Sequence, residues 1–150
     1  MSTIISIPAE YGYVLASIMA STFVNQYHGT LVGIERKSAN VPYPNAYATH
    51  AEATSDIKKY RFNCAQRAHQ NFLEHFPTFI AASAIAGLKY PVATAVMGAV
   101  WNVGRIVFAR GYINSTQEQK GAGRYKGAWY LLAELGLLGT ACYTAYQMIM

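Results

Sequence analysis

Three polar residues of complementary chemistry stand at helical spacing near the middle of the chain: Arg67, Asn71 and Glu74. Residues at positions i, i+4 and i+7 share one face of an α-helix, so a cation, an amide and a carboxylate would converge there. Such a face can hold a zwitterionic ligand, because a guanidinium binds carboxylates and a carboxylate binds an ammonium group. The same side chains can instead form a self-contained ion-pair network that helps helices pack, and the spacing leaves both interpretations open.

A second face is formed by Arg105, Phe108 and Tyr112, at positions i, i+3 and i+7. Tyr112 can donate a hydrogen bond, and Arg105 can pair with Glu74 of another helix. Arginine and tyrosine also anchor helices at membrane surfaces, which is the less specific interpretation. Glu134 is a further acid in an apolar segment, and it either pairs with Arg105 or is protonated.

A cluster of cations, Lys120, Arg124 and Lys126, precedes the last apolar segment. A cation beside a bound thiol lowers the thiol pKa and stabilises the thiolate, which is the nucleophilic form. On the residues alone, a basic loop at a membrane surface is the favoured interpretation. Motifs of soluble enzymes such as GxSxG, the P-loop and HExxH do not occur, and the histidines and cysteines lack metal-ligand spacing, so we expect no metal.

Four long segments of low charge must position these residues, at about 10–34, 66–88, 91–112 and 127–149. The 150-residue chain is 53% hydrophobic and only 13% charged, about half the charge of a typical soluble domain. Residues 11–34 contain no Asp, Glu, Lys or Arg and are long enough to cross a hydrocarbon core of about 30 Å. A soluble four-helix bundle would need a polar stripe on every helix. We therefore expect one all-α domain, an integral membrane four-helix bundle.

The distribution of basic residues predicts the orientation in the membrane. Of the 12 Lys and Arg residues, all but Lys89 lie between the first and second segments or between the end of the third and the fourth. The positive-inside rule then places both long loops in the cytosol and both termini in the lumen. The charge is therefore a topology signal, and we expect no nucleic-acid partner. The Met-Ser-Thr start has no basic region, so we expect an uncleaved first segment.

The run from Phe62 to Glu74, FNCAQRAHQNFLE, resembles the signature of the MAPEG family, membrane-associated proteins of eicosanoid and glutathione metabolism. The likeness continues through residues 10–15, 104–112 and 135–140, and so covers nearly the whole chain. It implies a homotrimer in the endoplasmic reticulum or outer mitochondrial membrane. It also implies that glutathione is bound as a co-substrate in a cleft between subunits that opens to the cytosol.

Residue roles follow from the resemblance alone, position by position. Arg67, Asn71 and Glu74 match the family's glutathione-binding triad, and Arg124 is the best match to its thiol-activating arginine. The preceding loop differs in length, so Lys120 or Lys126 remain alternatives to Arg124. Phe108 stands where catalytic relatives often carry a tyrosine. Further residues expected at the ligand are Arg36, His69, His75, Arg105, Phe108 and Tyr112.

These features predict a membrane glutathione transferase that also acts as a glutathione-dependent peroxidase. The thiolate of the bound glutathione would attack a lipophilic electrophile or a lipid hydroperoxide that arrives from the bilayer. Two alternatives stay open at this point. One is a non-catalytic family member that binds or presents lipid, and the other is a structural tetraspan membrane protein.

Overall fold

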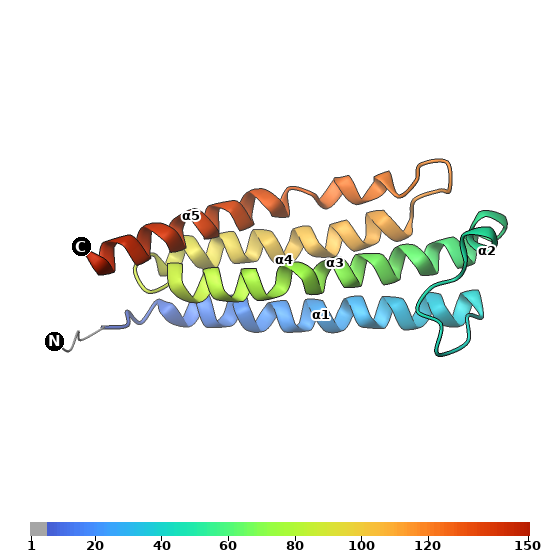
Figure 1. Cartoon of the computed structure of the whole chain (residues 1–150). Helices are drawn as coiled ribbons and strands as arrows, with labels where there is room; N and C mark the ends of the chain where they lie inside the picture. Colours follow the sequence, from blue (N-terminus) through green and yellow to red (C-terminus); the bar gives the residue numbers. More distant parts are fainter. Residues whose placement is uncertain (1–5) are drawn as a thin grey trace.

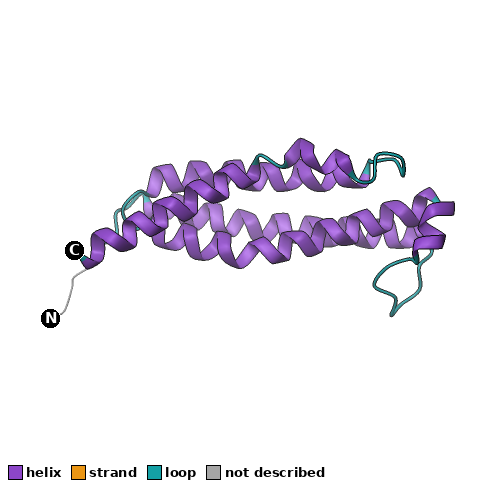
Figure 2. Cartoon of the chain, turned by 45° about the horizontal axis from the view of Figure 1, so that its top comes forward, coloured by secondary structure: helices purple, strands orange, loops and turns teal. Residues whose placement is uncertain are grey.

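Long helices account for most of the chain in the computed structural model, which describes residues 6–150 (Figure 1). They are α1 (Tyr11–Ala39), α3 (Ile57–Ala86), α4 (Pro91–Ile113) and α5 (Tyr130–Ile149), with a short α2 (His50–Ser55) and a 3-10 helix η1 (Ala122–Gly127). Residues 6–150 contain no strand (Figure 2), so the all-α prediction is confirmed. The expectation about an N-terminal signal falls partly on residues 1–5, outside the described part.

Two helices run further into the polar regions than the charge pattern predicts. α1 continues to Ala39 instead of ending near residue 34, and Arg36 and Lys37 lie in its last turn, where cations stabilise the negative end of the helix dipole. α3 begins at Ile57 instead of near residue 66, because the Asp56 carboxylate accepts a 2.8 Å hydrogen bond from the Lys58 amide and caps the helix. The charged ends are therefore helical extensions rather than loops.

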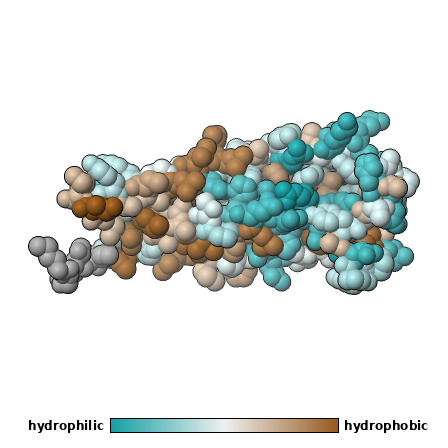
Figure 3. Space-filling view, viewed as in Figure 1, coloured by the Kyte–Doolittle hydropathy of each residue, from teal (hydrophilic) through white to brown (hydrophobic). Residues whose placement is uncertain are grey.

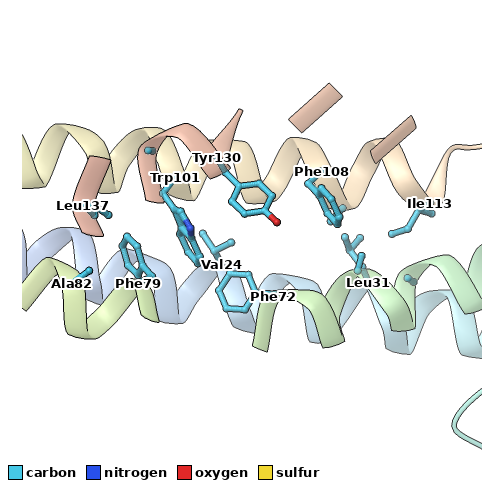
Figure 4. Packing of buried hydrophobic residues seen from close by; sticks show 14 of the residues in the cluster. Val24, Leu31, Phe72, Phe79, Ala82, Trp101, Phe108, Ile113, Tyr130 and Leu137 are labelled. Atoms are coloured by element: carbon cyan, nitrogen blue, oxygen red, sulfur yellow. The ribbon is translucent and has the colours of Figure 1, made fainter. Parts of the chain in front are cut away.

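The core is aromatic at its centre and contains aliphatic side chains such as Leu31 and Leu137, together with several alanines, elsewhere. α1 packs against α3 and α4, and α5 packs against the same two helices. Trp101 of α4 lies between two phenylalanines of α3, stacked on Phe79 with ring centres 4.0 Å apart and tilted against Phe72 at 5.3 Å (Figure 4). Each of these three side chains is fully buried. This packing fixes the rotation of α3, and thereby the direction in which its polar face points.

One described helix, α4, is both long and apolar enough to cross a membrane. Membrane crossing by the other three long helices stays a prediction. Large apolar side chains nevertheless cover much of their outer surfaces, including Phe23 at 73% exposure and Leu132 at 73%. Figure 3 shows more of the hydrophobic surface toward the end where α5 finishes and more of the hydrophilic surface toward α2.

Candidate functional site

The helix face predicted from the spacing of Arg67, Asn71 and Glu74 forms one hydrogen-bonded row on α3. Arg67 Nη1 donates to Glu74 Oε1 over 2.7 Å, and Nη2 donates to Oε2 over 3.4 Å. Asn71 Nδ2 donates to the same Oε2 over 3.4 Å. The Arg67 and Glu74 side chains remain 43% and 46% exposed, so a ligand can reach both without unfolding the helix.

A cavity of about 690 Å³ lies beside this row, under the connection between α1 and α3. Arg67, Tyr112 and Lys120 line it, together with Tyr47 and Tyr60. No carboxylate is among its lining residues. Arg67 is paired with Glu74 outside the cavity, whereas Lys120 forms no ion pair with the described residues. Two cations against aromatic walls, with no carboxylate in the lining, favour an anionic ligand with some apolar surface.

The wall of the cavity is held in place by hydrogen bonds between distant segments. Tyr47 donates to Gln70 Oε1 over 2.7 Å, and the Asn63 side chain makes bonds of 2.8 Å and 2.9 Å to the backbone of Ala48. Gln117 donates to the Ala53 carbonyl over 2.6 Å and so ties the α4–α5 connection to α2. Desolvation raises the pKa of Tyr47, so its phenol stays protonated and remains a donor at neutral pH.

The short helix α2 is fixed by its own first turn. Thr49 accepts from the Glu52 amide while the Glu52 carboxylate accepts from the Thr49 amide, which is a complete capping box. Lys59 of α3 forms an ion pair with Glu52. The hydrogen bond from Lys59 is the largest cause that lowers the Glu52 pKa to about 2. Glu52 therefore stays ionised, and the pair joins α2 to α3.

Arg124, the predicted thiol-activating residue, lies on η1 next to the cavity wall. Its guanidinium carbon lies 5.3 Å from the centre of the Tyr112 ring and 4.4 Å from that of Tyr125. Nη1 donates to the Gly121 carbonyl over 2.9 Å, and Nη2 donates to the Tyr125 hydroxyl over 2.8 Å. Of the two alternatives, Lys120 lines the cavity, whereas Lys126 lines a different groove on the outer surface.

Arg36 and His69 lie apart from the row on α3. Arg36 is sandwiched between the rings of Tyr43 and Phe62, at 4.4 Å and 4.6 Å, and it donates to the Asn45 carbonyl over 2.7 Å. His69 Nε2 lies 3.0 Å from Asn25 Oδ1 of α1. In this chain both side chains hold segments together, Arg36 the α1–α3 connection and His69 the α1–α3 contact.

Behind the row lies a buried polar network that extends into the aromatic core. Arg105 is fully buried, and its Nη1 donates to Asn71 Oδ1 over 2.9 Å. Within the described residues, its Nε and Nη2 have no hydrogen-bond partner. The rings of Phe72, Phe108 and Tyr130 surround the guanidinium at 5.3 Å, 5.0 Å and 4.3 Å. Arg105 thus fixes the orientation of the Asn71 amide from inside the protein.

Glu134 joins the same network through partners other than Arg105. The Trp101 indole donates to Glu134 Oε2 over 2.9 Å, and His75 Nδ1 lies 2.9 Å from Oε1. The Tyr130 hydroxyl lies 3.4 Å from both His75 Nε2 and Asn71 Oδ1. It therefore links the Glu134–His75 pair to the Asn71–Arg105 pair. Trp101 and Tyr130 were missed by the sequence reasoning. Tyr130 stands four residues before Glu134, so its position on the same helix face was a usable signal.

No group of three metal-ligating side chains gathers anywhere in the part of the chain that the structure describes. The polar groups at the site include guanidinium, ammonium and amide donors, phenol hydroxyls, an imidazole and a thiol, with the carboxylate of Glu74 beside the cavity. This donor set is suited to organic anions and zwitterions.

A family model for the MAPEG family matches residues 14–143. The match contains α3 and α4 in full, most of α1 and α5, and every predicted site residue. The chain therefore belongs to the MAPEG family, whose members are membrane-associated and include glutathione transferases and related enzymes.

Proposed function

We propose that this MAPEG protein is a membrane glutathione transferase that also reduces lipid hydroperoxides at the expense of glutathione. The observation that carries the proposal is the exposed row of Arg67, Asn71 and Glu74 beside a cavity lined by cations and aromatic rings. Glutathione is a zwitterionic peptide with two carboxylates, one ammonium group and one thiol, and each charge has a counterpart here. The run from Phe62 to Glu74 supports a finer assignment to the microsomal glutathione S-transferase 3 branch.

The row can bind the ligand at small cost. A solvent-exposed ion pair such as Arg67–Glu74 contributes little to stability, because water screens it, so a ligand can replace it without a large penalty. The glutathione carboxylate would bind Arg67 and Asn71 Nδ2, while its ammonium group would bind Glu74. Arg105 supports this arrangement, since its bond to Asn71 Oδ1 leaves the amide nitrogen directed at the row.

Arg124 is the residue proposed to activate the thiol. A guanidinium stays charged and donates several hydrogen bonds, so it stabilises a thiolate once the thiol proton has passed to water. The thiolate sulfur then forms a bond to carbon as an epoxide C–O bond breaks, and the oxygen takes a proton from water. With a hydroperoxide, sulfur attacks oxygen and releases an alcohol, and a second glutathione converts the sulfenic acid to a disulfide and water. Lys120, which lines the cavity, is the alternative cation.

The lipophilic substrate is proposed to enter from the bilayer along α1 and α5. Both helices carry exposed apolar side chains, among them Met19, Phe23, Leu132 and Leu135. We also propose a homotrimer, location in the endoplasmic reticulum or the outer mitochondrial membrane, and cytosolic long connections. These follow from family membership and from the distribution of basic residues.

The first prediction concerns thiolate formation. Glutathione added to the purified wild-type protein at pH 7 should give an ultraviolet thiolate band, and the protein should conjugate glutathione to a lipid epoxide. Arg124→Ala should lose the band and lower the conjugation rate by roughly 10²–10³-fold, as expected when an electrostatic stabiliser is removed. Lys58→Ala, which removes an exposed cation outside the cavity lining, is the matched control. A full thiolate band with Arg124→Ala would assign the role to another group.

The second prediction separates an enzyme from the two alternatives. Arg67→Ala and Glu74→Ala should each weaken glutathione binding by at least tenfold, because each removes the counterpart of one ligand charge. The control, Arg61→Ala, removes an exposed arginine two turns earlier on α3 and should bind normally. Glutathione should raise the unfolding temperature of wild type and control only. A lipid-presenting or structural tetraspan protein predicts no glutathione effect on any of the four proteins.

A further inference from the structure

A second groove, of about 330 Å³, lies on the outer surface where η1 meets α4. Two cations line it from opposite sides: Arg110 belongs to α4 and Lys126 to η1. Neither side chain forms an ion pair with any residue between 6 and 150, and no carboxylate is among the lining residues. The proposed glutathione function makes no use of this groove.

The two sides of the groove are held in a fixed relation by glycine contacts. A methyl group added to Gly123 of η1 would collide with the Gly111 carbonyl of α4, and one added to Gly127 would collide with Gly104 and Phe108. The Ser115 hydroxyl also accepts a 3.0 Å bond from the Gly123 amide. The two cations therefore lie on elements whose backbones are in close contact, and ligand binding would require little reordering of the backbone.

An apolar stripe leads from this groove along α4, the helix that is long and apolar enough to cross a membrane. Val92, Val96, Val103 and Ile106 lie on the same helix face as Arg110 by their spacing, and their exposures are 55%, 59%, 53% and 36%. From Val92 to Ile106 the stripe is about 20 Å long at 1.5 Å per residue. That length matches or exceeds one leaflet of a hydrocarbon core about 30 Å thick.

From these features we propose that the groove binds the headgroup of an anionic phospholipid, whose acyl chain lies along the α4 stripe. Arg110 and Lys126 would bind the phosphate, and the Asn114 side-chain amide and Gln119 Nε2 would bind the rest of the headgroup, while Gln119 Oε1 accepts from the Thr116 amide. The groove lies at the end of α4 that the basic residues place at the cytosolic surface, where anionic lipids attract cations.

The charge of the chain favours a lipid over another copy of the protein. The formal net charge is +5, and almost all basic residues lie at this end of the molecule. A second copy placed here would bring further cations against Arg110 and Lys126. A free anion such as inorganic phosphate would satisfy the two cations but would leave the apolar stripe uncovered.

The test measures binding and thermal unfolding of the full chain in neutral detergent. The additives are phosphatidylglycerol, phosphatidylcholine, the chain-free headgroup glycerophosphoglycerol, and inorganic phosphate. Phosphatidylglycerol alone should raise the unfolding temperature of the wild type. Arg110→Gln and Lys126→Gln should each weaken its binding about fivefold, the effect of about 1 kcal/mol per cation at an anionic surface. The matched control is the double variant Lys37→Gln/Lys58→Gln, which removes two exposed cations elsewhere at the same end and should bind like wild type.

Several results would overturn the proposal. Equal stabilisation by phosphatidylcholine would show that the groove does not select a negatively charged headgroup. Equal stabilisation by phosphate or by the headgroup alone would show that the site binds free anions. An equal loss of phosphatidylglycerol binding in the control variant would show that the lipid is attracted by the overall positive charge rather than by this groove. Light scattering of the Arg110→Gln/Lys126→Gln protein provides a further check, because a smaller number of subunits would identify the groove as a contact between copies. Each substituted side chain is exposed, and circular dichroism verifies that the variants retain their helices.

Discussion

At the scale of single residues, Glu134 is the acceptor that joins two other helices inside the protein. It receives the Trp101 indole from α4 and lies 2.9 Å from His75 Nδ1 of α3. Glu134→Ala would leave the buried Trp101 indole and the partly exposed His75 ring without this acceptor, and we expect a loss of about 1–3 kcal/mol in the free energy of unfolding. Glu134→Gln keeps one carbonyl oxygen as an acceptor, so we expect less than half of that loss.

Chemical unfolding in detergent micelles, followed by Trp fluorescence, measures these changes. Glu118→Ala removes an exposed acid from the α4–α5 connection and serves as the control, with an expected change within about 0.5 kcal/mol. Equal stability of the Glu134→Ala and wild-type proteins would mean that the hydrogen bonds to Glu134 contribute nothing net.

The row on α3 was predictable from the sequence, but the partners behind it were not. The spacing of Arg67, Asn71 and Glu74 alone places them on one face, because all three belong to one helix. The partner of Arg105 depends on how α4 is rotated against α3, which the packing of Trp101 against Phe72 and Phe79 determines. Sequence reasoning offered Glu74 or Glu134 as its partner, whereas the structure gives Asn71.

At the scale of elements, the contact between η1 and α4 depends on glycines on both sides. Gly123→Ala and Gly127→Ala each place a methyl group against the α4 backbone, and we expect each to destabilise the protein by about 1–3 kcal/mol. Gly139→Ala on α5 is the control, because its methyl group would meet nothing within 4 Å and alanine favours a helix by about 0.5–1 kcal/mol. Unfolding temperatures rank the three variants, and an unchanged Gly123→Ala protein would contradict the close approach.

Element boundaries were predictable where the chain is apolar and uncertain where it is polar. The predicted segment at 91–112 differs from α4 by one residue, since Pro91 starts the helix and Asn114 follows its end. The start of the last segment was expected near 127, but residues 122–127 form η1. A 3-10 helix is favoured there because its glycines allow the backbone to lie against α4, a tertiary effect that local sequence does not encode.

At the scale of the whole molecule, the two long connections lie at one end, and the start of α1, the end of α5 and the α3–α4 connection lie at the other (Figure 1). This arrangement brings the separated basic clusters at 36–67 and 105–126 together, and only Lys89 stands at the opposite end. The positive-inside rule predicts that the basic end faces the cytosol. The cavity, the α3 row and the α4 groove would then all be open to cytosolic ligands or to the cytosolic leaflet.

Cysteine labelling in sealed microsomes tests this orientation directly. In a background without Cys64 and Cys142, Glu118→Cys should react with a membrane-impermeant maleimide before permeabilisation, and Lys89→Cys should react only afterwards. Both chosen positions adjoin helix ends that the charge pattern assigns to opposite membrane surfaces, so the two variants control for each other. Because moving basic residues across a bilayer is costly, mixed labelling is not expected. Reversed labelling would place the glutathione site in the lumen, where a cytosolic glutathione pool would have no access to it.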